Sequence, residues 1–292
     1  MTGSHFLRLC LILLAAGHVV SAMGQGESVA STTSKRNLGS RIVGGTKADP
    51  KRHPYFTKLE ITFDSWFSSY SFSCGGTLIA KDVVLTAAHC LTPEYSWDSV
   101  WSIQAYVNST SIYYSQYEYS RVASRYFIHA SYDTSTFAND VALVYLDDPV
   151  EKVTLAKINK NGTAPVTGKA VTAVGLGLLQ NPNEMEATYL MQVSMKTLRG
   201  TDCSNLYGAS YFKTQNQICA GSTKNTCQGD SGGPLLLKGT TASKDVVTGI
   251  TSYGLAAGCG QKPSAYTRVS KYATWITSGV CDYSYYPPST CP

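Results

Sequence analysis

The sequence predicts an all-β protein built on a barrel or a sandwich, and two observations support this fold class. Short runs of strand-forming residues recur between turn residues, and only one stretch spaces its apolar residues as a helix does. The clearest runs are 83–86, 141–146, 170–174 and 246–250. With 43% apolar and 15% charged residues in a chain of 292, one large or two small domains can bury a sizeable core.

The first 22 residues are expected to be an export signal rather than part of the fold. Arg8 precedes an apolar run over 9–16, and a small-x-small cleavage site ends at Ala22. The run is short for a membrane span, although an uncleaved membrane anchor is the alternative interpretation. We therefore expect a secreted, extracellular protein that has no membrane association once residues 1–22 are removed.

Residues 23–41 have the composition of a flexible propeptide, being rich in Ser, Thr and Gly and ending in Arg41. Residues 1–41 carry four basic residues and one acidic residue, or +3, so the total of +5 leaves +2 for the remainder. A charge this close to zero argues against a polyanionic partner, and we expect no nucleic-acid binding.

The helical pattern lies near the C-terminus. Apolar residues at 269, 272, 273 and 276 would line one face of a helix, which we expect over 269–277. A tail rich in Tyr, Pro and Ser follows over 281–292. Tyrosine is also frequent between 106 and 132, where we expect strand residues on a half-exposed sheet, with an aromatic sugar-binding surface as the alternative.

Nine cysteines occur, of which Cys10 belongs to the signal. The even number that remains after an export signal predicts four disulfides formed in an oxidising compartment. A zinc site is the alternative, but no Cys-x-x-Cys pair occurs and the histidines do not cluster.

Three short motifs contain residues suited to nucleophilic catalysis. They are LTAAHC with His89, NDVAL with Asp140 and GDSGGP with Ser231. A serine hydroxyl needs a base to accept its proton as it attacks, and an imidazole titrates close to neutral pH. A buried carboxylate can orient that imidazole. Each motif alone is weak, but the order His, Asp, Ser together with the cysteine pattern is specific.

On these motifs the sequence resembles the chymotrypsin/trypsin family of serine proteases over nearly all of 42–280. The resemblance implies two packed six-stranded antiparallel β-barrels with a C-terminal helix, and a serine endopeptidase that needs no cofactor. It makes His89, Asp140 and Ser231 the catalytic triad, with the first two on one barrel and the serine on the other. The backbone N–H groups of Gly229 and Ser231 would form the oxyanion hole.

The segment Arg41-Ile42-Val43-Gly44-Gly45 resembles the activation junction of this family. The resemblance implies a zymogen that a second protease cuts after Arg41. The freed ammonium of Ile42 would then enter the body of the protein and pair with Asp230, because either buried charge alone is costly to desolvate.

The resemblance also locates a primary substrate pocket, whose base lies six residues before the nucleophile. That residue is Asn225, which carries no charge, so a buried Lys or Arg side chain would lose its partner. We expect cleavage after neutral residues such as Leu, Met, Tyr, Phe or Gln, and therefore activation by another, trypsin-like protease. Acceptance of Arg by the amide oxygen of Asn225 is the alternative. The expected lining residues are Asn225, Thr226, Ser252, Tyr253, Gly254, Pro263 and Ser264.

Further expectations concern disulfides, metals and glycans. The resemblance implies the pairs Cys74–Cys90, Cys203–Cys219 and Cys227–Cys259, which leaves Cys281 with Cys291 in the tail. Region 101–125 has Glu118 as its only carboxylate, so we expect no calcium or other metal site there. Two sequons, at Asn108 and Asn161, are candidates for N-glycosylation.

Two other classes of function deserve comparison. A non-enzymatic relative would have no physical need for the three catalytic residues and the activation junction. An esterase or lipase would also contain a Gly-x-Ser-x-Gly motif, but with the acid after the serine and with alternating strands and helices. The expected partners are protein or peptide substrates, the activating protease and protein protease inhibitors, and the mature protein is expected to be a monomer.

Overall fold

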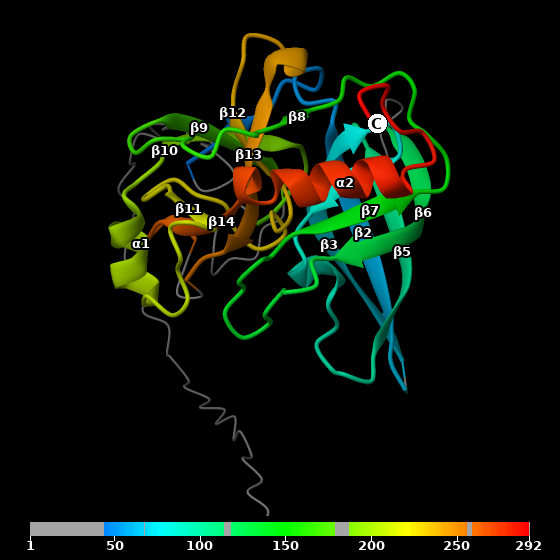
Figure 1. Ribbon diagram of the computed structural model, residues 1–292, viewed down its shortest axis with the longest axis horizontal. Coiled ribbons are helices and arrows are strands. Elements are labelled where there is room, and N and C mark those ends of the chain that lie inside the picture. Colours follow the sequence, from blue (N-terminus) through cyan, green and yellow to red (C-terminus); the bar gives the residue numbers. More distant parts are fainter. Residues whose placement is uncertain (1–43, 67, 114–117, 179–186, 256–258, 292) are drawn as a thin grey trace, which may run out of the picture. The chain divides into compact units, whose positions relative to one another are not determined.

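The computed structural model describes residues 44–66, 68–113, 118–178, 187–255 and 259–291 (Figure 1). The predicted signal and propeptide, with Arg41 and Ile42, lie outside the described residues. Within them, no helix is both long and apolar enough to cross a membrane.

Six antiparallel strands of the N-terminal half close into a barrel in the order β2-β3-β4-β7-β6-β5. Along β2, the side chains of Leu59, Ile61 and Phe63 are fully buried, whereas Glu60 and Thr62, which lie between them, are partly exposed. This alternation is what a strand with one buried face requires. The strands are β2 (Phe56–Asp64), β3 (Ser69–Ala80), β4 (Val83–Thr86), β5 (Ser99–Val107), β6 (Tyr119–Ile128) and β7 (Ala142–Leu146).

The C-terminal half forms a second, eight-stranded sheet in the order β1-β10-β9-β12-β13-β14-β11, with β8 paired in parallel to β13. Figure 1 shows it beside the barrel, with β9 to β14 on the left and β2 to β7 on the right. Its strands are β1 (Thr46–Lys47), β8 (Lys157–Ile158), β9 (Ala170–Gly175), β10 (Met191–Lys196), β11 (Gln217–Ala220), β12 (Pro234–Leu237), β13 (Val246–Tyr253) and β14 (Ser264–Arg268).

The fold class is confirmed, but the second sheet differs in detail from the closed six-stranded barrel that was expected. The sheet contains the six strands β9 to β14, and β1 and β8 extend it to eight. The sheet curves back where Thr197 bridges Ala220 and Leu198 N donates to Cys219 O at 2.8 Å. This single bridge does not continue as a ladder, because the chain turns into helix α1 (Gly200–Tyr207) just beyond β10, and the sheet is therefore a half-barrel.

The predicted C-terminal helix is present, but it begins as a 3-10 turn (η3, Val269–Lys271) and continues as α2 (Ala273–Tyr283). It extends beyond 277 because Val280 continues the buried face of Ile276 one turn later. Glycine at 279 permits close packing, since a Cβ there would lie 2.5 Å from Leu143. Helix α1 was not predicted, because Cys203 is its one buried residue and so no apolar periodicity marks it.

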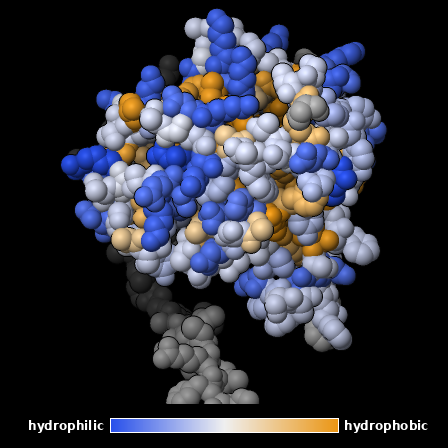
Figure 2. Space-filling view, in the orientation of Figure 1, coloured by the Kyte–Doolittle hydropathy of each residue, from blue (hydrophilic) through white to orange (hydrophobic). Residues whose placement is uncertain are grey.

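Two large apolar clusters hold the protein together. One fills the barrel and the contact with α2, and the other fills the second sheet. On the face shown in Figure 2, hydrophilic residues predominate and hydrophobic ones form only small groups. All four expected disulfides are formed, Cys74–Cys90, Cys203–Cys219, Cys227–Cys259 and Cys281–Cys291.

Candidate active site

The fold brings His89 and Asp140 into direct contact at one end of the barrel. His89 begins a 3-10 turn (η1, His89–Leu91) after β4, and Asp140 precedes β7, which pairs with β4. The ring atom Nδ1 of His89 lies 2.8 Å from Asp140 Oδ2, and the backbone N–H of His89 donates to Oδ1 at 2.9 Å. Two hydrogen bonds from one residue therefore fix the imidazole relative to the carboxylate.

The environment of this pair favours its charged forms. Asp140 is fully buried, which alone would raise the pKa of its carboxyl. The charge of His89 and the hydrogen bonds from His89 and Ser252 outweigh burial, so the pKa of Asp140 lies below its usual value. Burial would lower the pKa of His89, but the Asp140 carboxylate raises it above the usual value. His89 is thus prepared to accept a proton on its other ring nitrogen, Nε2.

A third donor to Asp140 comes from the second sheet. The hydroxyl of Ser252, on β13, donates to Asp140 Oδ2 at 2.5 Å. The sequence analysis assigned Ser252 to the substrate pocket alone, and the residue does line that pocket. Its contact with Asp140 was missed, because no local pattern around either residue signals a contact across 112 positions.

Ser231 lies in a tight turn before β12, and its backbone connects the two halves of the protein. Its carbonyl oxygen accepts a hydrogen bond of 2.7 Å from the N–H of Gly75, on β3. Gly75 follows Cys74, whose disulfide partner is Cys90, next to His89. The Ser231 hydroxyl forms no hydrogen bond with any described residue, His89 included. In catalytic sites, a hydrogen bond between the nucleophile and its base often forms only when the substrate is bound.

The turn around Ser231 presents two unused backbone N–H groups. The N–H of Asp230 donates to Cys227 O at 3.1 Å and that of Gly232 to Thr251 O at 2.9 Å. The N–H groups of Gly229 and Ser231 have no partner within the described part of the chain. Gly229 has φ +86°, a conformation that glycine adopts without strain. Two free donors beside a serine suit a developing oxyanion.

Asp230 is a buried carboxylate without a cation among the residues that the structure describes. Its oxygens accept N–H bonds of 2.8 Å from Gly177 and Cys227. Burial raises its pKa to about 6 despite these bonds. The described chain starts at Gly44, and β1 is held by the pairing of Thr46 with Gln192. Burial of an ionised carboxylate without a cation is costly, which is the physical cause of the raised pKa.

A cavity of about 230 Å³ opens beside Ser231. It is lined by every predicted pocket residue except Pro263, namely Asn225, Thr226, Ser252, Tyr253, Gly254 and Ser264. Its wall also includes Thr251, which the sequence analysis missed and whose buried hydroxyl oxygen has no partner in the described structure.

The carboxamide of Asn225 at the base of this cavity is already engaged. Its Nδ2 donates to Lys262 O at 2.8 Å. Its Oδ1 accepts from Thr226 N and from the hydroxyl of Tyr266, each at 2.9 Å. Both lone-pair directions of Oδ1 are thus used. The hydroxyl of Ser264 has no partner among the described residues, and a Cβ at Gly254 would lie 3.0 Å from it.

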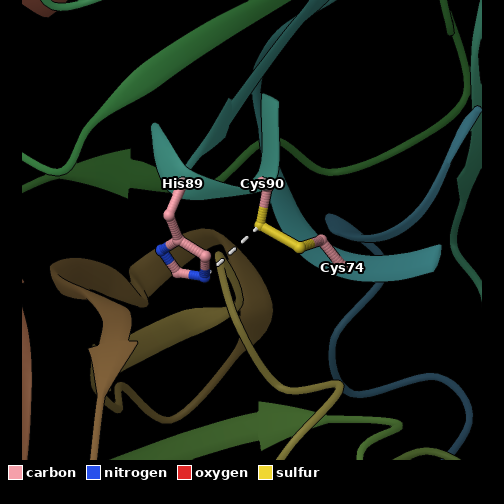
Figure 3. Close-up of side chains that lie close together, drawn as sticks. All are labelled: Cys74, His89 and Cys90. Carbon is pink, nitrogen blue, oxygen red and sulfur yellow. Dashed lines mark hydrogen bonds between the residues drawn. A yellow bond between two sulfur atoms is a disulfide. The ribbon is translucent and has the colours of Figure 1, made fainter. Parts of the chain in front are cut away.

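The sulfur atoms of Cys74 and Cys90 lie close to His89, and cysteine and histidine also occur together in metal sites. The ligand atoms of Cys74, His89 and Cys90 fall within 4.8 Å of one another (Figure 3). The two sulfurs are joined as a disulfide, however, and a metal ligand would have to be a thiolate. This cluster does not fit a metal ion.

Comparisons with known proteins agree with this geometry. The family model described as Trypsin matches residues 42–276. The chain is 34% identical to brachyurin of Leptuca pugilator over 240 residues, which cover 80% of this chain and 96% of that protein. It is 31% identical to kallikrein-7 of Homo sapiens over 252 residues, which cover 84% and 89% of the two chains. The chain therefore belongs to the trypsin family and is a serine endopeptidase.

Proposed function

We propose that this endopeptidase is secreted as a zymogen and, once activated, cleaves peptide bonds after neutral side chains. The observation that carries the proposal is the combination of three features in one cleft. These are the His89–Asp140 pair, the Ser231 turn with two free N–H groups, and a pocket whose base, Asn225, is uncharged.

In the proposed mechanism, Ser231 Oγ attacks the substrate carbonyl while His89 Nε2 takes the hydroxyl proton. Asp140 keeps the other ring nitrogen protonated and stabilises the imidazolium. The N–H groups of Gly229 and Ser231 bind the oxyanion. His89 then gives its proton to the leaving amine, and water hydrolyses the acyl-enzyme with His89 again acting as the base.

Ser252 is proposed to position Asp140, and its removal gives a first prediction. We expect Ser252→Ala to lower kcat about tenfold, because a hydrogen bond to a charged group contributes roughly 1.5–3 kcal/mol. The acidic limb of the pH–kcat/KM profile should move at the same time, since Asp140 and His89 titrate as a pair. Ser252→Thr keeps the hydroxyl and should recover most of the activity. A loss of kcat with an unmoved pH profile would contradict this role.

The hydrogen bonds of Asn225 support the proposed specificity. Its amide oxygen is saturated, so a bound guanidinium or ammonium would have to displace Thr226 N or the Tyr266 hydroxyl. This weakens the alternative in which Asn225 accepts Arg. The hydroxyls of Ser264 and Thr251 add polar groups to the pocket, and none of its described lining residues is a carboxylate that could pair with a cation. The proposed substrates therefore carry Leu, Met, Tyr, Phe or Gln before the cut.

A second prediction tests this specificity. Matched peptides that differ only in the residue before the cut should give a kcat/KM at least about 100-fold higher for Leu or Tyr than for Arg or Lys. Burying the cationic side chain of Arg or Lys in the pocket without a counter-charge costs several kcal/mol, and a cost of about 3 kcal/mol corresponds to a factor of about 100. A peptide library read by mass spectrometry makes the comparison without bias. A preference for Arg over Leu and Tyr would show that the pocket does not work as proposed.

The remaining proposals concern maturation. We propose that residues 1–22 are removed on export, that a trypsin-like protease cuts after Arg41, and that 42–280 form the protease domain with 281–292 as a disulfide-closed tail. Two contacts support the docking of the tail, because Asp82 accepts hydrogen bonds from the Ser284 hydroxyl and from Tyr285 N. The mature protein is proposed to act as a monomer on protein or peptide substrates. Protein protease inhibitors are proposed to bind it.

Of the two sequons, Asn161 is the better candidate for a glycan. It is exposed in a loop, where its side chain accepts bonds from Thr163. Asn108 is half-buried with φ 62°, and its N–H donates to Phe56 O at 2.9 Å. The side chain of Asn108 is therefore less accessible for glycan attachment than that of Asn161.

A further inference from the structure

A second groove borders the Ser231 turn on the side away from the primary pocket. Its volume is about 570 Å³, and its walls come from both halves of the protein. The barrel contributes Lys58, Glu60 and Cys74, whereas the opposite wall includes Leu178, Gln228 and Gly229. The groove thus begins at one of the two free N–H groups of the turn.

Its position relative to the other cavities indicates which part of a substrate it would receive. The primary pocket shares Tyr253, Gly254 and Leu255 with a neighbouring apolar cavity, so these two form one continuous path. The groove has only Gln228 in common with the primary pocket and no lining residue in common with the apolar cavity. A chain that enters along the first path and passes Ser231 has this groove ahead of it on the far side of the turn.

The location of His89 agrees with this direction. Its Nε2, the nitrogen that gives a proton to the leaving amine, lies 3.9 Å from Cys90 Sγ (Figure 3). The disulfide partner of Cys90 is Cys74, which lines the groove. The groove therefore lies on the leaving-group side of the scissile bond.

Two charged side chains line this groove, and they are not equally available. Lys58 Nζ donates to Glu60 Oε1 at 3.0 Å and to Ile112 O at 3.3 Å, and it lies 4.3 Å from the centre of the Tyr106 ring. The side chain of Lys58 is 10% exposed and that of Glu60 is 43% exposed. The Glu60 carboxylate also accepts a bond of 3.0 Å from the Tyr106 hydroxyl at Oε2, but its larger exposure leaves it within reach of the groove, whereas the ammonium is enclosed by its partners.

A second carboxylate makes the charge balance negative. Glu118 is 8% exposed, and its Oε2 is buried without a partner in the described structure. It interacts electrostatically with both Lys58 and Glu60. Burial raises the pKa of Glu118, so these three groups carry a net charge of −1 only when Glu118 is ionised, and the more exposed Glu60 is the carboxylate that faces the groove. A cation on a bound peptide would be attracted to this wall, and an anion would be repelled.

We infer that this groove binds the residues that follow the scissile bond, and that Glu60 makes it select Lys or Arg over Asp or Glu there. The inference rests on the proposed function, because the direction of the substrate follows from the roles of Ser231 and His89. It makes Glu60 a specificity-determining residue that acts on the leaving-group side, independently of the primary pocket.

The test uses the full-length protein cut after Arg41 and peptides with Leu before the cut. Lys, Ala or Glu is placed in turn at the first, second or third position after it. At one of these positions we expect kcat/KM for Lys to exceed that for Glu about tenfold at low ionic strength. The ratio should fall towards about two in 0.5 M NaCl, since the interaction lies at the surface.

Three variants separate the inference from a general charge effect. Glu60→Gln should bring the Lys-to-Glu ratio close to one, whereas Lys58→Gln should increase it, because Glu60 then loses its positively charged partner. Asp64→Asn is the matched control, as it removes the same charge from the same strand outside the groove and should leave the ratio unchanged.

A ratio near one at all three positions, or a ratio that survives Glu60→Gln, would overturn the inference alone. Failure of the cut protein to hydrolyse even the peptide with Ala at all three positions would overturn the proposed function, and the inference with it.

Discussion

Replacing Ser231 by Ala in the protein cut after Arg41 is expected to lower kcat about a million-fold. Without the hydroxyl there is no nucleophile to form an acyl-enzyme, and only binding and the oxyanion hole still assist attack by water. The substrate's KM should change little, because the Ser231 side chain contributes little to binding. Hydrolysis of a Leu or Tyr peptide, followed over days for the variant, measures the effect.

The double variant Ser231→Ala, His89→Ala provides the control. Residues that act as a unit give non-additive losses, so the double variant should be about as slow as either single variant. A loss for the pair that equals the product of the two single losses would mean that His89 and Ser231 act independently, contrary to the proposed mechanism.

The second large effect concerns activation. We expect the uncut chain to be nearly inactive and to gain at least about 100-fold in kcat/KM when cut after Arg41. The ammonium of Ile42 would pair with Asp230 and hold Gly229 and Ser231 in the shape that binds the oxyanion, and loss of one oxyanion donor costs about 100- to 1000-fold. Asp230→Asn should therefore reduce activity by a similar factor in the cut protein. Equal rates for the cut and uncut proteins would contradict this account.

The pKa of Asp230 adds a pH signature to the same proposal. In the uncut protein this pKa is raised to about 6, above the value in an unfolded chain. The folded state then binds more protons than the unfolded state between about pH 4 and 6, so the free energy of unfolding falls as pH rises through this window. One pKa unit is about 1.4 kcal/mol, so the loss amounts to about 3 kcal/mol.

Urea unfolding between pH 4 and 7.5 measures this loss. The uncut Asp230→Asn variant should lack it, because its side chain does not titrate. The cut wild-type protein should lack it too, since the ammonium lowers the pKa of its partner. The same pH slope in all three proteins would show that Asp230 is not the group responsible.

The sequence predicted the parts of the site that depend on local motifs. Three short patterns predicted His89, Asp140 and Ser231 as the catalytic residues, and the family resemblance predicted Asn225 at the base of the pocket. Contacts between distant segments were not predicted. The bond from Ser252 to Asp140 and the saturation of Asn225 by Tyr266 both depend on how β13 and β14 pack against the rest of the site.

The fold shows the same division. The strands were visible as short runs of strand-forming residues and the helix at 269–277 as a periodic pattern, and the closed barrel agrees with the family resemblance. Helix α1 was missed because a short helix with one buried residue has no detectable periodicity. The incomplete closure of the second sheet was missed because it depends on where the chain leaves β10. Tertiary packing determines that point, and no local sequence pattern marks it.

The most direct test of the central claim is covalent labelling by a serine-directed organophosphonate, located by peptide mapping. The account predicts that the cut protein is labelled at Ser231, and that the uncut chain and the cut His89→Ala variant react far more slowly. Labelling at another serine, or a cut protein that remains unlabelled under conditions that modify trypsin, would contradict the claim that His89, Asp140 and Ser231 form the catalytic centre.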